Sequence, residues 1–440
     1  MTQQSAEEKS AMLIKGGRVI NPGILDGTTD ILIRNGKIAE IAPEIGPEPG
    51  TRVIEASGKI VSPGLIDMHV HFREPGHEYK ETIATGCLAA VHGGFTSVCT
   101  MPNTHPVNDS GEVTEYILKK AADANRARVF PVAAISKKIK GKSLCEYGEL
   151  KESGAVALSD DGNPVVNSQL MRRAMEYARG FGLLIISHCE EPELAANGVM
   201  NEGALATRMG LPGIPNASES VMVMRDIALC ELTGARVHIA HVSTAESVHA
   251  IRDAKKRGVP VTAETAPHYF TLVEDAVADY NTHAKMNPPL RSHRDREAIR
   301  EGLADGTIDV IATDHAPHSP LEKKVEFDRA ANGIIGLETS LPLSLKLAEE
   351  GIITLSGLIE KMSVNPARIL GLEHGMKVGN PADITIIDPD LSYTVNAENF
   401  RSLSRNTPFD GWNMKGRAVM TIVGGDAVFS GIPEEDNIPG

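Results

Sequence analysis

The sequence predicts an α/β protein with a (β/α)₈ TIM-like barrel and a small flanking β-sandwich module built from both chain ends. From Pro63 onward, short apolar runs alternate with longer segments of helical periodicity, which indicates parallel strands joined by helices. Before and after this stretch, short apolar runs are separated by turn residues, which indicates a β module. We therefore expect the barrel over residues 63–375 and a discontinuous β module over 1–62 and 376–440.

The first part of the β module is expected to consist of short strands with turns between them. The strands are predicted at residues 12–14, 18–20, 30–33 and 37–41. Gly16-Gly17 separates the first two runs, and Asn35-Gly36, before the last, is a strong hairpin signal. At the other end of the chain, a closing helix is predicted over 355–370, and strands return at 382–388, 393–395 and 417–423.

The predicted barrel strands are apolar runs in the middle of the chain. They end near His71, Thr100, Ala134, Leu158, Ile186, Ile239, Ala263 and Ile311. The segments between them have helical periodicity, most clearly at 80–92, 112–124, 169–179, 219–232, 244–256 and 294–303. Active sites of such barrels lie at the C-terminal ends of the strands, so polar residues there are the first candidates for function.

Composition and charge argue against several classes of protein. The net charge is −14 at pH 7 and no dense Lys/Arg block occurs, so nucleic-acid binding is not expected. No apolar stretch is long enough to span a bilayer, and residues 1–10 lack the apolar core of a signal peptide. The five cysteines are scattered without a CxxC pair, which argues against a disulfide framework. We expect a reduced, cytoplasmic protein.

The end of the first barrel strand carries His69-Val70-His71. Side chains two positions apart on a strand share one face, so the two imidazoles form a two-point clamp for a metal ion. Other strand ends carry further metal-competent side chains, namely Asp160, Asp161, His188, His241 and Asp314. Each alone has a structural explanation as a core histidine, a cap or a turn residue. Together on one barrel rim they predict a site for zinc or another borderline divalent ion in a hydrolytic enzyme.

Longer strings around these residues resemble a known family. They are Asp67–Gly76, Met101–Thr104, Ser159–Gly162, Ser187–Glu190, His241–Ser243, Glu264–Tyr269, Lys285–Arg291 and Thr313–His318. With them, the chain resembles the amidohydrolase superfamily and, within it, the bacterial type I dihydroorotases. The resemblance runs over essentially the whole chain. It implies reversible ring closure of N-carbamoyl-L-aspartate to L-dihydroorotate in pyrimidine biosynthesis, with one or two Zn²⁺ ions.

The resemblance also implies roles for the metal-site residues. One ion would be held by His69, His71 and Asp314, and the other by His188 and His241. Asp161 would bridge the ions, with Asp160 as the alternative. Many relatives bridge with a carbamylated lysine on the fourth strand, but no lysine lies between Lys151 and Lys255. This departure favours a dihydroorotase over the hydantoinase branch.

The remaining expected site residues act on protons and substrate. Asp314 is placed to carry the proton between water and the ring nitrogen. The guanidinium of Arg73 can hold a substrate carboxylate bidentately. The family pattern adds further substrate contacts, which are His71, Asn103, Asn287, His318, Asn332 and Gly333. Some relatives carry Phe-Gly where this chain has Asn332-Gly333, so only backbone contacts are expected to survive that change. The charged segment 315–335 fits either a solvated surface loop or a binding loop at the rim.

Two other functions are compatible with the sequence. One is a different cyclic amidohydrolase, such as an allantoinase or hydantoinase. The other is an inactive structural partner of aspartate transcarbamoylase, although such relatives are expected to lack metal ligands that are present here. An active enzyme could also form a homodimer or a complex with aspartate transcarbamoylase.

Overall fold

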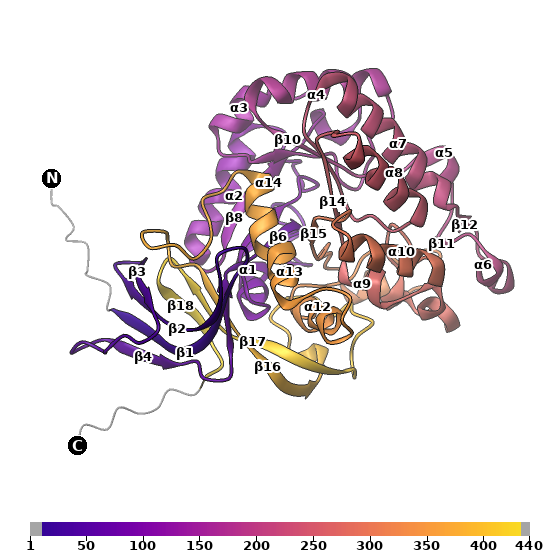
Figure 1. The fold of residues 1–440 in the computed structure, drawn as a ribbon. Helices are drawn as coiled ribbons and strands as arrows, with labels where there is room; N and C mark the ends of the chain where they lie inside the picture. Colours follow the sequence, from indigo (N-terminus) through magenta and orange to yellow (C-terminus); the bar gives the residue numbers. More distant parts are fainter. Residues whose placement is uncertain (1–10, 433–440) are drawn as a thin grey trace.

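The structure is a computed structural model that describes residues 11–432. Residues 433–440 and residues 1–10, where the sequence predicts no signal peptide, lie outside the described part. Eight parallel strands form a nearly closed barrel, and a second eight-stranded sheet flanks it on one side (Figure 1). This is the architecture that the alternating apolar and helical segments predict. The domain boundaries at 62/63 and 375/376 stay a prediction.

The barrel strands follow each other in chain order around the barrel. They are β6 (Leu65–Val70), β7 (Phe95–Thr100), β8 (Arg128–Ala133), β9 (Ala157–Leu158), β10 (Leu184–Ser187), β13 (Val237–Ile239), β14 (Val261–Thr265) and β15 (Val310–Ile311). The first and last strands approach each other where Val70 pairs in parallel with His315. There the N–H of His71 donates to the carbonyl of His315 at 2.8 Å, which brings the two ends of the metal-site sequence together.

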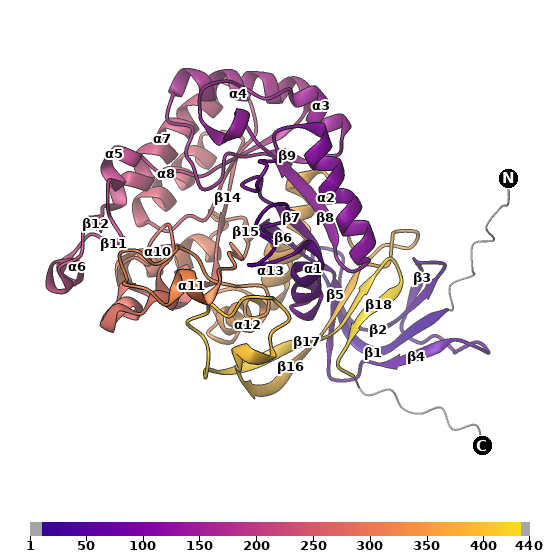
Figure 2. The same cartoon turned by 180° about the vertical axis from the view of Figure 1, so that it is seen from behind.

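The helices pack around the outside of this barrel (Figures 1 and 2). They are α1 (Ile83–His92), α2 (Gly111–Ala124), α3 (Tyr147–Glu152), α4 (Ser168–Phe181), α7 (Asn216–Thr233), α8 (Ala245–Lys256), α10 (His293–Ala304), α12 (Ser340–Glu349), α13 (Leu355–Ile359) and α14 (Asn365–Leu370). Local sequence sets several of their ends. Thr82 caps α1 and Ser292 caps α10 in capping boxes, and Gly182 ends α4 in the left-handed conformation that glycine favours.

The flanking sheet joins strands from both chain ends. It contains β1 (Met12–Asn21), β2 (Leu25–Arg34), β3 (Lys37–Ala42), β4 (Arg52–Glu55), β5 (Ile60–Pro63), β16 (Ile384–Thr394), β17 (Asn413–Val423) and β18 (Asp426–Ser430). The two halves meet where β5 pairs antiparallel with β16. Since β5 leads directly into β6, this pairing anchors the first metal-site strand to the flanking module.

Three details of the predicted strands are wrong. The runs 12–14 and 18–20 belong to the single strand β1, because Gly16-Gly17 forms an irregularity within the strand instead of a turn. Gly16 has φ +67°, and the pairing with β2 shifts register between Ile14 and Gly17, as at a β-bulge. The runs 382–388 and 393–395 likewise fall largely within the one strand β16. A final strand, β18, lies where none was predicted.

Apolar side chains fill the inside of the barrel below the rim formed by the C-terminal ends of its strands. Ile66 and Met68 of β6 belong to this core, which continues with residues such as Val132, Ile186 and Val310. Beyond Met68, the pairing of β6 with β7 shifts register between Asp67 and Val70. Such irregularities redirect side chains.

The structure also shows the state of the cysteines and the character of the helices. All five cysteines are free thiols with buried side chains. Burial raises the pKa of Cys87 to about 12, so this thiol stays protonated and unreactive at neutral pH. Between residues 11 and 432, no helix combines the length and the apolar character needed to cross a membrane.

Candidate metal centre

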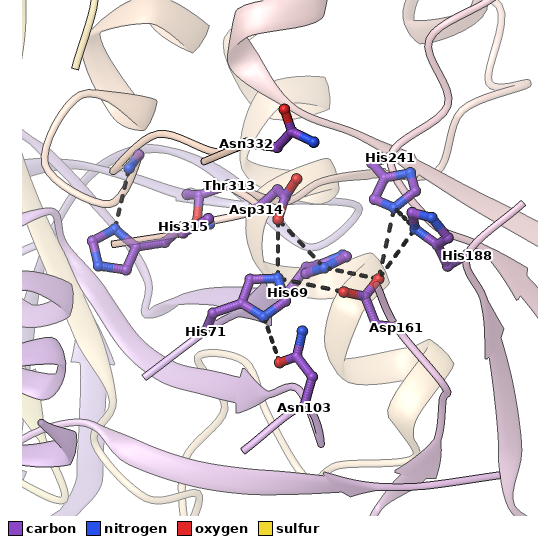
Figure 3. A network of polar contacts seen from close by, with 12 residues as sticks. His69, His71, Asn103, Asp161, His188, His241, Thr313, Asp314, His315 and Asn332 are labelled. Atoms are coloured by element: carbon purple, nitrogen blue, oxygen red, sulfur yellow. Dashed lines mark hydrogen bonds and ion pairs between the residues drawn. The ribbon is translucent and has the colours of Figure 1, made fainter. Parts of the chain in front are cut away.

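The predicted metal ligands lie at the C-terminal ends of five barrel strands. They are His69 and His71 on and after β6, Asp161 after β9, His188 after β10, His241 after β13 and Asp314 after β15. All six side chains are buried or nearly so. Because parallel barrel strands all end at the same rim, residues far apart in the sequence converge there (Figure 3).

Asp161 lies between two histidine pairs. Its carboxylate oxygens are 3.3 Å from Nε2 of His69 and 3.4 Å from Nε2 of His71. On the other side, Oδ1 is 3.6 Å from Nε2 of His241 and 3.7 Å from Nδ1 of His188. The arrangement therefore consists of two groups of possible metal ligands that share one carboxylate.

The two neighbouring aspartates Asp160 and Asp161 point in different directions. The Asp160 carboxylate accepts hydrogen bonds from the backbone N–H and the hydroxyl of Ser136, so it holds the preceding loop. Asp314 contacts one histidine pair, with Oδ1 at 3.2 Å from Nε2 of His71 and 3.5 Å from Nε2 of His69. Asp161 is thus the aspartate of this pair that lies between the histidines, and Asp314 lies on the His69 side.

The cluster contains polar atoms that the described protein leaves unsatisfied. Nε2 of His69, Oδ1 of Asp161 and Nε2 of His188 are buried and, within residues 11–432, have no hydrogen-bond partner. Buried polar atoms without partners are costly, so such a group indicates a missing ligand. Four bonds of about 2.0–2.1 Å around a tetrahedral ion separate the donor atoms by roughly 3.4 Å. The carboxylate–imidazole separations of 3.2–3.7 Å are close to this spacing, whereas Nδ1 of His188 and Nε2 of His241 lie closer, at 2.7 Å.

The electrostatics of the cluster also favour a cation. Burial alone would raise the pKa of Asp161, but the positive charges of the nearby imidazoles, that of His69 above all, hold that pKa well below its usual range. Burial likewise acts to lower the pKa of His69, yet Asp161, Asp314 and Glu264 raise it well above normal. Three carboxylates thus surround one imidazole, and a divalent ion would supply the positive charge that they attract.

Glu264, at the end of β14, fixes the orientation of His69. Its Oε1 lies 2.6 Å from Nδ1 of His69, and its Oε2 lies 3.1 Å from Nε2 of His238. The neighbouring histidines outweigh burial and lower the pKa of Glu264 to about 2, so the carboxylate is ionised and can only accept. Nδ1 of His69 must therefore carry the proton, which leaves Nε2 free to bind a metal. Sequence reasoning assigned Glu264 no role, although a carboxylate at a barrel strand end was the signal.

Asp67 is a second residue that sequence reasoning left without a role. Its carboxylate accepts from the N–H of Thr313 at 3.0 Å and from the Thr313 hydroxyl at 2.5 Å. These bonds tie β6 to Thr313, the residue before Asp314. Asp314 itself has a backbone φ of +49°. Asp67 therefore sets the spacing between the histidine pair and Asp314.

On the same rim, Arg73 carries a charge that no carboxylate of residues 11–432 pairs. Its Nε donates to the carbonyl of Pro317 at 3.2 Å. Its Nη2 lies 3.4 Å from Nε2 of His318. That nitrogen donates to the carbonyl of Asn332 at 2.7 Å, so it cannot also accept a hydrogen bond from the guanidinium. Within the described chain no carboxylate lies within ion-pair distance of Arg73. Burial lowers its pKa to about 10, which still leaves it cationic at neutral pH.

The other predicted substrate contacts lie near these groups. Oδ1 of Asn103 is 2.9 Å from Nδ1 of His71, so Asn103 orients this histidine, and within residues 11–432 its amide N–H₂ has no hydrogen-bond partner. Asn287 donates to Glu190 at 2.6 Å, and its Oδ1 is buried without a partner in the described chain. The structure therefore brings the polar residues predicted from both ends of the barrel sequence to one rim.

Segment 315–335 is a folded segment in which buried side chains alternate with exposed ones such as Lys324 and Arg329. It contains the short helix α11 (Pro320–Lys323), and the side chains of Lys323, Phe327 and Ala330 are buried. A groove of about 640 Å³ lies beside it, lined by Asn332, Lys285 and residues of 197–212. Another cavity, of about 700 Å³, lies between α12 and the β16–β17 hairpin and contains none of the predicted site residues.

Comparisons with known proteins agree with this chemistry. Residues 58–247 match the family model described as dihydro-orotase-like. Among solved structures, an L-hydantoinase (dihydropyrimidinase) from Arthrobacter aurescens has a TM-score of 0.87 and 26% identity, covering 96% of this chain and 97% of that one. A D-hydantoinase (dihydropyrimidinase) from a Thermus species has a TM-score of 0.81 and 27% identity, covering 95% of each chain. The fold is thus shared with enzymes named for cyclic amides.

Curated relatives are closer in sequence. A dihydroorotase from Desulforapulum autotrophicum is 59% identical over 417 residues, covering 94% of this chain and 98% of the relative. A dihydroorotase from Desulfotalea psychrophila is 60% identical with the same coverage, and one from Syntrophus aciditrophicus is 57% identical over 95% of this chain and 99% of its own length. By this full-length similarity, the chain belongs to the dihydroorotase family.

Proposed function

We propose that this chain is a dihydroorotase that catalyses the reversible cyclisation of N-carbamoyl-L-aspartate to L-dihydroorotate and water. We place the reaction in de novo pyrimidine biosynthesis, in the cytoplasm. One observation carries the proposal: two histidine pairs that share Asp161 lie on the same rim as the unpaired guanidinium of Arg73. A metal site suits amide hydrolysis, and the guanidinium suits a cyclic amide that bears a carboxylate.

The proposed cofactor is Zn²⁺, with one or two ions per chain. One ion would be held by Asp314, His69 and His71, and the other by His188 and His241. Asp161 would bridge the two. When bound, the ions would polarise the amide carbonyl and lower the pKa of water at the site. The choice of zinc is supported by a donor set of imidazoles and carboxylates without thiolates.

Asp314 is the proposed proton carrier. Burial would raise the pKa of this carboxyl, but His69, His71 and His241 hold it well below its usual range, so it is ionised at neutral pH. In ring opening, Asp314 accepts a proton from the attacking water and donates it to the ring nitrogen as the C–N bond breaks. In ring closure, it takes a proton from the carbamoyl nitrogen as the C–N bond forms and passes it to the departing oxygen.

Substrate recognition is proposed to depend on Arg73 and its neighbours. The guanidinium, already held through Nε by Pro317, has its outer N–H groups available for a substrate carboxylate. Asn103 would add its free amide N–H₂ to that carboxylate. His318 would act beside Arg73, while Asn287 and the backbone of Asn332 and Gly333 would contact the ring.

The alternative functions have less support. A hydantoin or allantoin lacks the ring carboxylate that the unpaired Arg73 is suited to bind. The rim also offers an aspartate, Asp161, where many hydantoinase-type relatives are expected to bridge with a modified lysine. A purely structural partner of aspartate transcarbamoylase would have no need for the complete ligand set gathered here.

The test combines metal content with substrate choice. The purified chain is expected to contain zinc and to turn over L-dihydroorotate but neither hydantoin nor allantoin. Asp314→Asn should reduce turnover by at least about 100-fold, in the range that general acid–base catalysis contributes. Asp123→Asn, at an exposed position on α2, serves as the matched control. Turnover of only the other rings would refute the substrate, and unchanged turnover in Asp314→Asn would refute its role.

The assembly state is a separate proposal. We propose that the chain acts as a homodimer or with aspartate transcarbamoylase, as the family resemblance implies. Size-exclusion chromatography with light scattering, with and without the transcarbamoylase, measures both. A monomer that is fully active alone would contradict it.

A further inference from the structure

The short segment Ala331–Gly333 contacts one buried ammonium group, and the carbonyl of Gly333 also accepts from Nδ2 of Asn406 at 3.0 Å. Lys323, at the end of α11, is 1% exposed. Its Nζ donates to the carbonyls of Lys285 at 3.2 Å, Ala331 at 2.8 Å and Gly333 at 3.0 Å. A lysine ammonium has three N–H donors, so each is matched by one acceptor. None of the three partners is a carboxylate, which is unusual for a buried charge.

Other bonds occupy almost every remaining backbone group of this segment. The N–H of Ala331 donates to the carbonyl of Glu322, and the N–H of Gly333 to the carbonyl of Lys285, each at 3.0 Å. The carbonyl of Asn332 accepts from Nε2 of His318 at 2.7 Å. Within residues 11–432, the backbone N–H and the side-chain amide of Asn332 have no hydrogen-bond partner. Asn332 is also exposed, so these donors are available to a ligand.

The position of Asn332 is fixed relative to the metal centre. Ile334 pairs in parallel with His315, and its carbonyl accepts from the N–H of Ala316 at 2.8 Å. His315 directly follows Asp314, and Figure 3 shows Asn332 above that aspartate. Gly333 permits this approach, because at φ +124° an added Cβ would lie 2.6 Å from Cβ of Ala316. Asn332 therefore lies beside the rim that carries the metal centre.

A second buried lysine supports the preceding residues. Nζ of Lys285, which is 4% exposed, donates to the carbonyls of Asp328 at 3.0 Å and Ala330 at 2.8 Å. Segment 328–333 is thus organised around two ammonium groups. Burial lowers the pKa of Lys323 to about 7, which reflects the cost of keeping this charge out of water. By contrast, the adjacent Lys324 is exposed.

We propose that Lys323 is a positioning residue for substrate binding, holding the carbonyls of Ala331 and Gly333 so that the free donors of Asn332 meet an oxygen acceptor on the cyclic amide substrate. The inference rests on the proposed function, which makes this rim the substrate site. Lys323 itself touches neither substrate nor metal. Its removal should therefore loosen the segment and weaken substrate binding, while the metal centre and the chemical step persist.

The test compares Lys323→Met with Lys324→Met, the exposed neighbour, in the full zinc-loaded chain. If removing the ammonium reduces the fraction of correctly placed loop to about a tenth, the KM for L-dihydroorotate rises about tenfold. The value of kcat should stay within about threefold of the wild type, and zinc content should not change. Lys324→Met should match the wild type in all three quantities. A tenfold fall in kcat with unchanged KM would overturn the proposal, as would unchanged values of both.

Hydrogen exchange gives a readout that does not depend on turnover. Amides of segment 328–334 should exchange faster in Lys323→Met than in Lys324→Met, because the carbonyls of Ala331 and Gly333 lose the ammonium donor and the segment can then move away from the acceptors of its N–H groups. Equal exchange in the two variants would overturn the inference even if KM changed. If the wild type does not turn over L-dihydroorotate, the proposed function fails, and the exchange result alone decides whether Lys323 orders this segment.

A milder variant covers the case in which Lys323→Met does not fold. Lys323→Gln retains an N–H₂ group and can keep part of the hydrogen bonding. It should give a smaller rise in KM and a smaller loss of amide protection. A Lys323→Gln protein with lower zinc content and unchanged KM would contradict a positioning role, because the lysine would then support the metal centre.

Discussion

Glu264→Gln tests the proposed metal centre without altering any of its ligands. The substitution keeps the size of the side chain but removes its charge. Glu264 now contacts two histidines, with 2.6 Å to Nδ1 of His69 and 3.1 Å to Nε2 of His238. A glutamine offers one oxygen and one N–H₂ group, so it can accept from only one of these rings in the same way.

The expected magnitude follows from those two contacts. A hydrogen bond to a charged group contributes about 1.5–3 kcal/mol, and a neutral one about 0.5–1.5 kcal/mol. Converting both contacts to neutral bonds therefore costs about 2–3 kcal/mol in total, and losing one of them costs about 1.5–3 kcal/mol. Because about 1.4 kcal/mol corresponds to a factor of ten, zinc affinity at the His69 side should fall about 10- to 100-fold.

Zinc affinity can be measured by competition with a chelator of known affinity. Zinc held between His188 and His241 should bind as in the wild type, so only one class of site should weaken. Glu301→Gln, at an exposed position on α10, is the control for loss of a negative charge elsewhere. An affinity of Glu264→Gln within twofold of the wild type, or an equal loss in Glu301→Gln, would refute the idea that Glu264 orients His69.

Two further predictions concern substrate choice and pH. Arg73→Lys replaces the planar guanidinium by a single point charge. In steady-state assays it should raise the KM for L-dihydroorotate about 10- to 100-fold, with zinc content unchanged. An unchanged KM would contradict carboxylate binding by Arg73. Burial raises the pKa of Glu338 to about 7, so the folded state holds this proton more tightly than the unfolded chain, and stability should fall as pH rises from about 4.5 to 7. Glu338→Gln keeps an oxygen that can accept from the N–H groups of Arg401 and Ser402. In urea unfolding, this variant should be about 1–3 kcal/mol more stable than the wild type at pH 8 and equally stable at pH 4. An equal gain at both pH values would contradict a titrating Glu338.

Some features of the fold followed from local patterns. The period-two pattern of His69 and His71 and the helical periodicity of segments such as 219–232 depend on residues close in sequence, so they could be predicted. The β module was harder, because a glycine pair can form either a turn or a bulge. Gly16-Gly17 forms a bulge here since β1 pairs on both sides of it, with β2 and with the parallel strands β4 and β5.

The sequence alone determined which residue types stand at the ends of the barrel strands, and hence that a metal-competent rim was expected. That inference succeeds because parallel strands bring all their C-terminal ends to one side. Tertiary structure alone decided the orientation of individual side chains. Asp161 faces the histidines while Asp160 faces Ser136, and Glu264 reaches His69 across 195 positions of sequence. Lys323 lies in a charged stretch that suggests a solvated surface, yet the carbonyls folded over it bury its ammonium. Such contacts depend on neighbours brought together by folding, which no local periodicity encodes.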